Sequence, residues 1–203
     1  MAHNTETELR ARRLARGRAL EATTLVWNVV GVCVLVVAAV TARSVALAGF
    51  GIDSLIEIGA STVVLWELAC LDPERRRRAM RFIGGAFVLL AVYVAAQSTV
   101  VLIVGFHPHH SPLGIVWTSL TALVMFSLAA GKARIGAALG NPVLQAEGRI
   151  TLIDGILATA VLVGLVLNAL RGWWWADPFA GYVLLYYAVR EARASLAQPA
   201  RDA

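Results

Sequence analysis

Residues 44–57 read SVALAGFGIDSLIE, and this stretch places two carboxylates, Asp53 and Glu57, inside an apolar segment. A helix would put these two acids on one face, about one turn apart. An ionised acid at membrane depth costs roughly 2.5–3.5 kcal/mol on insertion scales, so such residues usually serve a proton, a cation or a partner of opposite charge. Asp53 and Glu57 are therefore the first candidate functional residues.

The composition is that of an integral membrane protein. The 203 residues are 59% hydrophobic and 15% charged, which leaves too little polar surface for a soluble domain. The arginines cluster between apolar stretches and do not alternate with aromatics, so no nucleic-acid partner is expected. Cys33 and Cys70 lie in apolar stretches without the spacing of a disulfide framework or a zinc site.

Six apolar stretches predict an all-α, polytopic fold with six transmembrane helices and three parts. The parts are a basic arm at residues 1–20, a transmembrane domain at 21–193 and a short tail at 194–203. A signal peptide is a competing interpretation of the N-terminus, but the first apolar run is long for one. The predicted spans are residues 22–42, 45–71, 82–106, 113–130, 143–170 and 173–189.

The distribution of basic residues predicts the orientation. Of the 18 Lys and Arg residues, 15 lie in the N-terminal arm, the second and fourth connections and the C-terminal tail, whereas only Arg43 and Arg171 lie in the opposite connections. By the positive-inside rule both termini are cytoplasmic. The protein is expected in the cell membrane as a multi-pass protein with the lipid bilayer as its surroundings.

The fifth predicted span carries a second pair of acids. Asp154 lies deep within it, and Glu147 lies two turns earlier on the same face. Residues 54–57 (SLIE) can also be aligned with residues 151–154 (TLID), so the second and fifth spans each offer an acid at an equivalent place. In the predicted orientation the second span enters the membrane from the outside and the fifth span enters it from the cytoplasm, so Asp53 and Asp154 both approach the bilayer midplane. Transporters hold their substrates at this depth.

Two further groups of polar residues are weaker candidates. Asn28 in the first span could supply an oxygen to a site or hydrogen-bond a neighbouring helix. His107, His109 and His110 could collect a divalent metal in the outer loop, although a proline-broken turn enforces no coordination geometry.

These motifs resemble the cation diffusion facilitator family, the cation efflux transporters. Residues 44–57 are similar to that family's second helix, residues 144–154 to its fifth and residues 177–181 (DPFAG) to the start of its sixth. The resemblance implies a divalent cation/proton antiporter, usually a homodimer, with metal ligands at Asp53, Glu57 and Asp154. It covers the transmembrane domain only, and no cytoplasmic metal-binding domain is expected after the short tail.

One departure from the family pattern bears on the site. Ile150 stands where the family usually has a fourth ligand. Thr151 or a water molecule could complete the shell, and Glu147 could be the next station for metal or protons toward the cytoplasm. Three carboxylates form a hard oxygen set that suits Mn, Mg or Fe(II), with Zn and Co still open.

The predicted function is therefore transport of a divalent metal as substrate, with no permanent cofactor. Burial and mutual repulsion both disfavour charge on clustered acids, so protons and metal should compete for them. The alternative is a degenerate family member that no longer transports and acts as a membrane interaction protein. An enzyme is not expected, because no HExxH motif or nucleophile–base pair is present.

Overall fold

The computed structural model describes residues 2–67, 73–140 and 142–201, and this part of the chain is built from helices joined by short connections. The mainly helical class predicted from the sequence is confirmed. The helices, in chain order, are α1 (Ala2–Ala42), α2 (Val45–Glu67), α3 (Pro73–Val104), α4 (Pro112–Leu139), α5 (Pro142–Arg171) and α6 (Ala176–Arg201).

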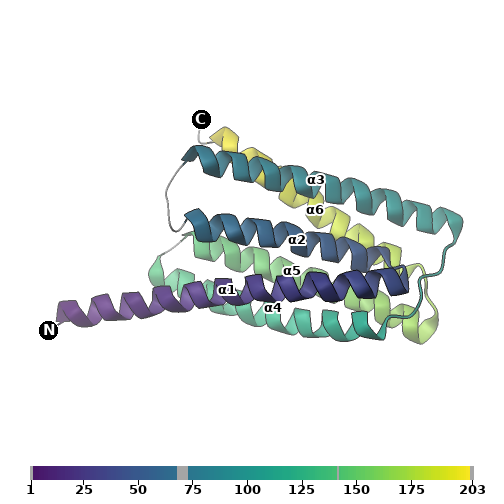
Figure 1. The fold of residues 1–203 in the computed structure, drawn as a ribbon, viewed down its shortest axis with the longest axis horizontal. Coiled ribbons are helices and arrows are strands. Elements are labelled where there is room, and N and C mark those ends of the chain that lie inside the picture. The colour runs from purple at the N-terminus through teal and green to yellow at the C-terminus, as the bar shows by residue number, and fades with distance from the viewer. Residues whose placement is uncertain (1, 68–72, 141, 202–203) are drawn as a thin grey trace.

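Successive helices run in opposite directions, so both termini lie at the same end of the bundle (Figure 1). The end of α2, the start of α3, the end of α4 and the start of α5 lie at this end too, and the other three connections lie at the opposite end. We call the end at which both termini lie the terminal end. The predicted basic arm is not a separate helix, because α1 continues from Ala2 through the first apolar stretch.

Four helical segments are long and apolar enough to cross a membrane among the described residues. They are Leu9–Ala42, Gly84–Val104, Pro112–Leu139 and Glu147–Arg171. Their outward faces are apolar as well; Val40 and Ile103, for example, are 72% and 80% exposed. Side chains of this kind are stable on the outside of a protein when lipid surrounds it. The crossings predicted for α2 and α6 are not among these four and stay predictions.

Short polar motifs begin and end the helices. Ser111 caps α4 by accepting a hydrogen bond from the Gly114 amide at 3.1 Å, and Pro112 opens that helix. Gly140 ends α4 in the left-handed conformation, with φ of 62°. α5 begins two residues later, at Pro142.

The start of α2 is fixed by another helix. The Asp177 carboxylate in α6 accepts hydrogen bonds from the amides of Val45 at 3.0 Å and Ala46 at 3.4 Å, and the Ser44 hydroxyl donates to it. These amides belong to the first turn of α2, where helical amides have no partner within the helix. Asp177, only 1% exposed, therefore joins α6 to α2 at the end opposite the termini.

α2 is the central helix of the bundle. It contacts α1, α3, α5 and α6, while α4 packs mainly on α5 and α3 mainly on α6. Glycine allows the close approach of α4 and α5: a Cβ atom at Gly148 would lie 3.1 Å from the Ala133 backbone nitrogen. Four polar side chains of α2 are buried, namely Asp53, Ser54, Glu57 and Ser61, whereas Thr62 is exposed.

Candidate metal centre

The three predicted ligands are buried and lie together. Asp53, Glu57 and Asp154 are 4%, 8% and 5% exposed and line one small cavity of about 20 Å³ between α2 and α5. The cavity holds about one particle the size of a water molecule.

Asn28 joins α1 to this group. Its side-chain amide donates a hydrogen bond to Glu57 Oε2 at 2.9 Å, and the residue is buried. Of the two roles considered for Asn28, the structure therefore has the hydrogen bond between helices. The amide orients the Glu57 carboxyl group, which leaves the other oxygen, Oε1, for another contact.

Asp154 has an oxygen that is still available. Its Oδ2 atom is buried and has no hydrogen-bond partner among the described residues. A buried acceptor without a hydrogen bond lowers the stability of the fold by about 1–3 kcal/mol, and by more when it is charged. A cation or a proton in the cavity would remove this cost.

The carboxylates are gathered but do not form a finished coordination shell. Within the described ranges, no three His, Cys, Asp or Glu side chains stand close enough to hold a metal ion as they are placed. Ile150, where the family usually has a ligand, lines the same cavity with its apolar side chain. Ion binding at this place would need the carboxylates to draw together.

Glu191 is a fourth acid at the cavity, and the sequence reasoning missed it. It lies in α6, lines the cavity and interacts electrostatically with Asp53. It lies beyond the predicted sixth span; there, burial raises the pKa of its carboxyl group and the Arg190 guanidinium partly offsets the shift. The signal was helical spacing, because Glu191 follows the buried Leu184 and Ala188 on one face.

A second acidic cluster lies nearer the terminal end. Lys132 of α4, with no exposed surface, donates hydrogen bonds to Glu21 Oε2 and Thr151 Oγ1, each at 3.0 Å, and lies 3.5 Å from Glu147 Oε2. Glu147 and Thr151 are thus side by side, as helical spacing predicts, but both face a lysine. Lys132 is one of the basic residues that predict the orientation, but helical spacing from Met125, Leu128 and Ala129 places it on a buried face of α4.

The other candidates lie away from both clusters. His107, His109 and His110 are exposed in the connection α3–α4, where the His107 ring contacts Trp174 with centroids 5.0 Å apart. Arg149 is exposed too, so it does not neutralise the buried acids.

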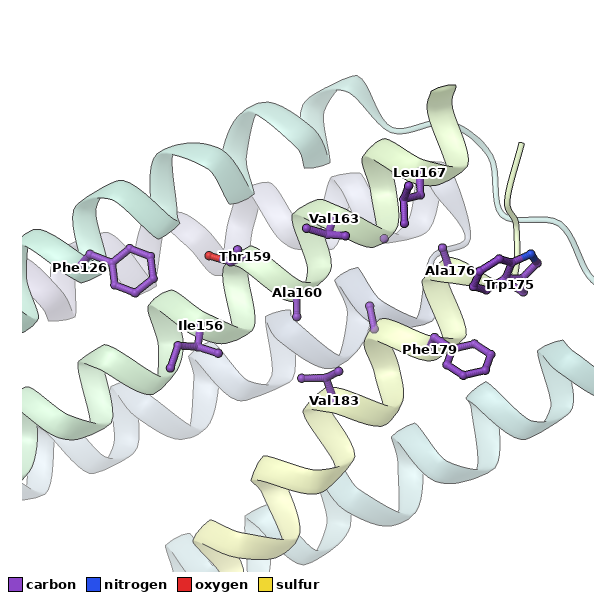
Figure 2. Close-up of a pocket in the computed structure, with 12 residues that line it drawn as sticks. Phe126, Ile156, Thr159, Ala160, Val163, Leu167, Trp175, Ala176, Phe179 and Val183 are labelled. Carbon is purple, nitrogen blue, oxygen red and sulfur yellow. The ribbon is translucent and has the colours of Figure 1, made fainter. Parts of the chain in front are cut away.

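The largest cavity that we describe is an apolar groove of about 530 Å³ between α5 and α6, with Phe126 of α4 at one end (Figure 2). Thr159 supplies the one hydroxyl among its labelled residues, and no ionisable side chain lines it. It therefore offers no ligands to a cation.

A protein-family model matches a large part of this fold. The family model described as the cation efflux transmembrane domain matches residues 79–198, more than half of the chain. The chain belongs to the cation efflux family. Its members are transporters and not enzymes, which makes the protein a metal cation transporter of the membrane in general terms.

The matched segment runs from early α3 to late α6, so it includes Asp154 and Glu191. Asp53 and Glu57 precede it. A comparison with curated proteins gives no match. The role of the acids in α2 therefore depends on their geometry alone.

Proposed function

We propose that the protein exchanges a divalent metal ion for protons across the cell membrane through the carboxylates of α2 and α5. The metal would be held by Asp53, Glu57 and Asp154. In this proposal all six helices cross the bilayer, the terminal end is cytoplasmic, and the chain works as a homodimer. The direction of transport is efflux.

The observation that carries the proposal is the cavity shared by three buried acids. Lys132 of the second cluster acts on Glu57 electrostatically but forms no ion pair with it. No described lysine or arginine forms an ion pair with Asp53, Glu57 or Asp154. An ionised carboxylate without a partner costs free energy in an apolar surrounding. The three acids therefore favour binding of a mobile cation or of protons. Metal and protons compete for the same oxygens, and binding of one releases the other.

Exchange follows from this competition. A metal ion entering from the cytoplasm displaces protons from the carboxyl groups, and protons arriving from the other side displace the metal. Oxygen ligands favour Mn²⁺, Mg²⁺ or Fe²⁺, and carboxylates also accept Zn²⁺ and Co²⁺. Glu147 and Thr151 would lie on the cytoplasmic side of the site.

The test is proton release. Addition of Mn²⁺ to the purified protein in weak buffer should acidify the solution, and proteoliposomes with a Mn²⁺ gradient should move protons in the opposite direction. Asp53→Ala should lose both signals while it still elutes as a folded protein in size-exclusion chromatography. Unchanged flux in Asp53→Ala and Asp154→Ala together would refute this site.

The alternative is a non-transporting family member that serves as a membrane interaction protein. Ile150 and the incomplete coordination shell favour it. A wild-type protein that releases no protons with any of Mn²⁺, Zn²⁺, Co²⁺, Fe²⁺ or Mg²⁺ would support this alternative.

A further inference from the structure

We propose that Glu191 of α6 supplies the fourth carboxylate ligand of the metal site, in place of the side chain that Ile150 lacks. The inference rests on the proposed function, because it extends the same cavity. It assigns a ligand to a helix outside the α2–α5 pair.

The first argument is position. Glu191 and Ile150 line the same cavity of about 20 Å³ as Asp53 and Asp154. The cavity has room for about one particle the size of a water molecule, and its carboxylates would have to draw together around an ion. Glu191 also interacts electrostatically with Asp53, although the two residues belong to different helices.

The second argument is that an acceptor in this cavity has no partner. Asp154 Oδ2 is buried, its residue is 5% exposed, and no described donor reaches it. Asp154 and Glu191 line the same cavity, so an ion that binds there could be shared by the two carboxylates. The unsatisfied atom is an observation separate from the lining of the cavity, and it favours binding of a cation or a proton there.

The third argument is that Glu191 is weakly engaged elsewhere. Its ion pair with Arg190 is long, at 3.8 Å, and the Arg190 side chain is 55% exposed. Exposed pairs of this kind contribute little, about 0–1 kcal/mol. The Arg190 guanidinium also lies over the Tyr187 ring, 5.8 Å from its centroid, so it has another contact to keep.

The experiment measures Mn²⁺ binding to the purified full chain through the loss of the free-ion electron paramagnetic resonance signal. Glu191→Gln should weaken Mn²⁺ binding by about tenfold or more, because a charged oxygen ligand is lost. Glu191→Asp, with a shorter carboxylate, should fall between wild type and Glu191→Gln. Arg190→Gln is the matched control on the same turn and should bind as tightly as wild type or more tightly.

Rescue separates ligation from a general effect of charge. Ile150→Asp restores an acid at the position that the family uses, so the double variant Ile150→Asp/Glu191→Gln should bind Mn²⁺ within about threefold of wild type. If only the total negative charge mattered, an added acid would restore Mn²⁺ binding equally well at position 150 and at an exposed position. The control is therefore Leu152→Asp/Glu191→Gln, in which the new acid is on an exposed face of α5.

The outcomes distinguish this inference from the proposed function. If Glu191→Gln binds Mn²⁺ like wild type while Asp154→Asn does not bind it, Glu191 is not a ligand and the α2–α5 site stands. If Asp154→Asn also binds like wild type, the proposed site itself is wrong. Equal rescue by acids at positions 150 and 152 would overturn ligation by Glu191.

Discussion

The two buried acidic clusters of this protein differ in the cation that accompanies them. Glu21 and Glu147 face Lys132, which is fixed to α4 and has no exposed surface. Asp53, Glu57 and Asp154 have no such partner among the described residues and share a cavity. The first cluster is an internal salt bridge that joins three helices, whereas the second leaves its charge to be balanced from outside.

The comparison teaches that burial of acids alone does not identify a transport site. A search for acids in apolar helices would find both clusters. Glu147 is predicted in this way to be a further station for metal or protons. What separates them is whether the chain itself supplies the opposite charge.

The largest effect should come from Asp154, because it holds the unsatisfied oxygen. Asp154→Asn should reduce Mn²⁺ binding more than a hundredfold and abolish proton exchange. Glu147→Gln is the matched change in the cluster that already has its cation, and it should retain measurable binding. Equal losses in the two variants, measured in the same vesicles, would erase the distinction between the clusters.

The next effect concerns stability. Lys132→Gln leaves Glu21 and Glu147 buried without their cation, and breaking a buried pair from one side costs about 3–5 kcal/mol. The free energy of unfolding in mixed detergent micelles should fall by this amount. The double variant Lys132→Gln/Glu21→Gln should recover a large part of it; a double variant as unstable as the single one would contradict the internal salt bridge.

A smaller loss is expected at the far end of α2. Asp177→Ala removes the acceptor for the Val45 and Ala46 amides and should lower the free energy of unfolding by about 1–3 kcal/mol. Asp177→Asn, which keeps one oxygen, should lose less. Thermal unfolding followed by circular dichroism would measure both, and no change in either would mean that α2 begins without this cap.

The smallest effect is expected from the outer loop. The triple variant His107→Ala/His109→Ala/His110→Ala should transport Mn²⁺ within about twofold of wild type, because these exposed side chains lie outside the two buried clusters. Complete loss of transport in vesicles would show that metal reaches the carboxylates through this loop.

The sequence was sufficient for the helical class and for the choice of three acids that are buried at one cavity, while their role as metal ligands stays a prediction. Hydrophobic stretches and helical spacing depend on local order along the chain, and Asp53, Glu57 and Asp154 follow from them. The predicted boundary between the basic arm and the first span is not a helix end, since α1 runs without a break from Ala2. A change from charged to apolar residues does not by itself end a helix.

Contacts between distant helices could not be predicted. Lys132 meets Glu21 across 111 residues, and Glu191 reaches the cavity from a helix that no motif connects to α2. A lysine at the end of an apolar stretch is typical of the membrane interface. The burial of Lys132 could not be predicted because it depends on the close approach of α4 and α5 at Gly148.

The attachment of α6 to α2 through Asp177 has a mechanical consequence. Asp177 and Glu191 are 14 residues apart in one helix, about 21 Å along its axis. Because the Asp177 end is fastened to the first turn of α2, any swing of α6 is smallest there and grows toward Glu191. A tilt of a few degrees about this pivot would shift the Glu191 carboxylate by about an ångström or more, several times the roughly 0.2 Å by which metal–oxygen distances vary.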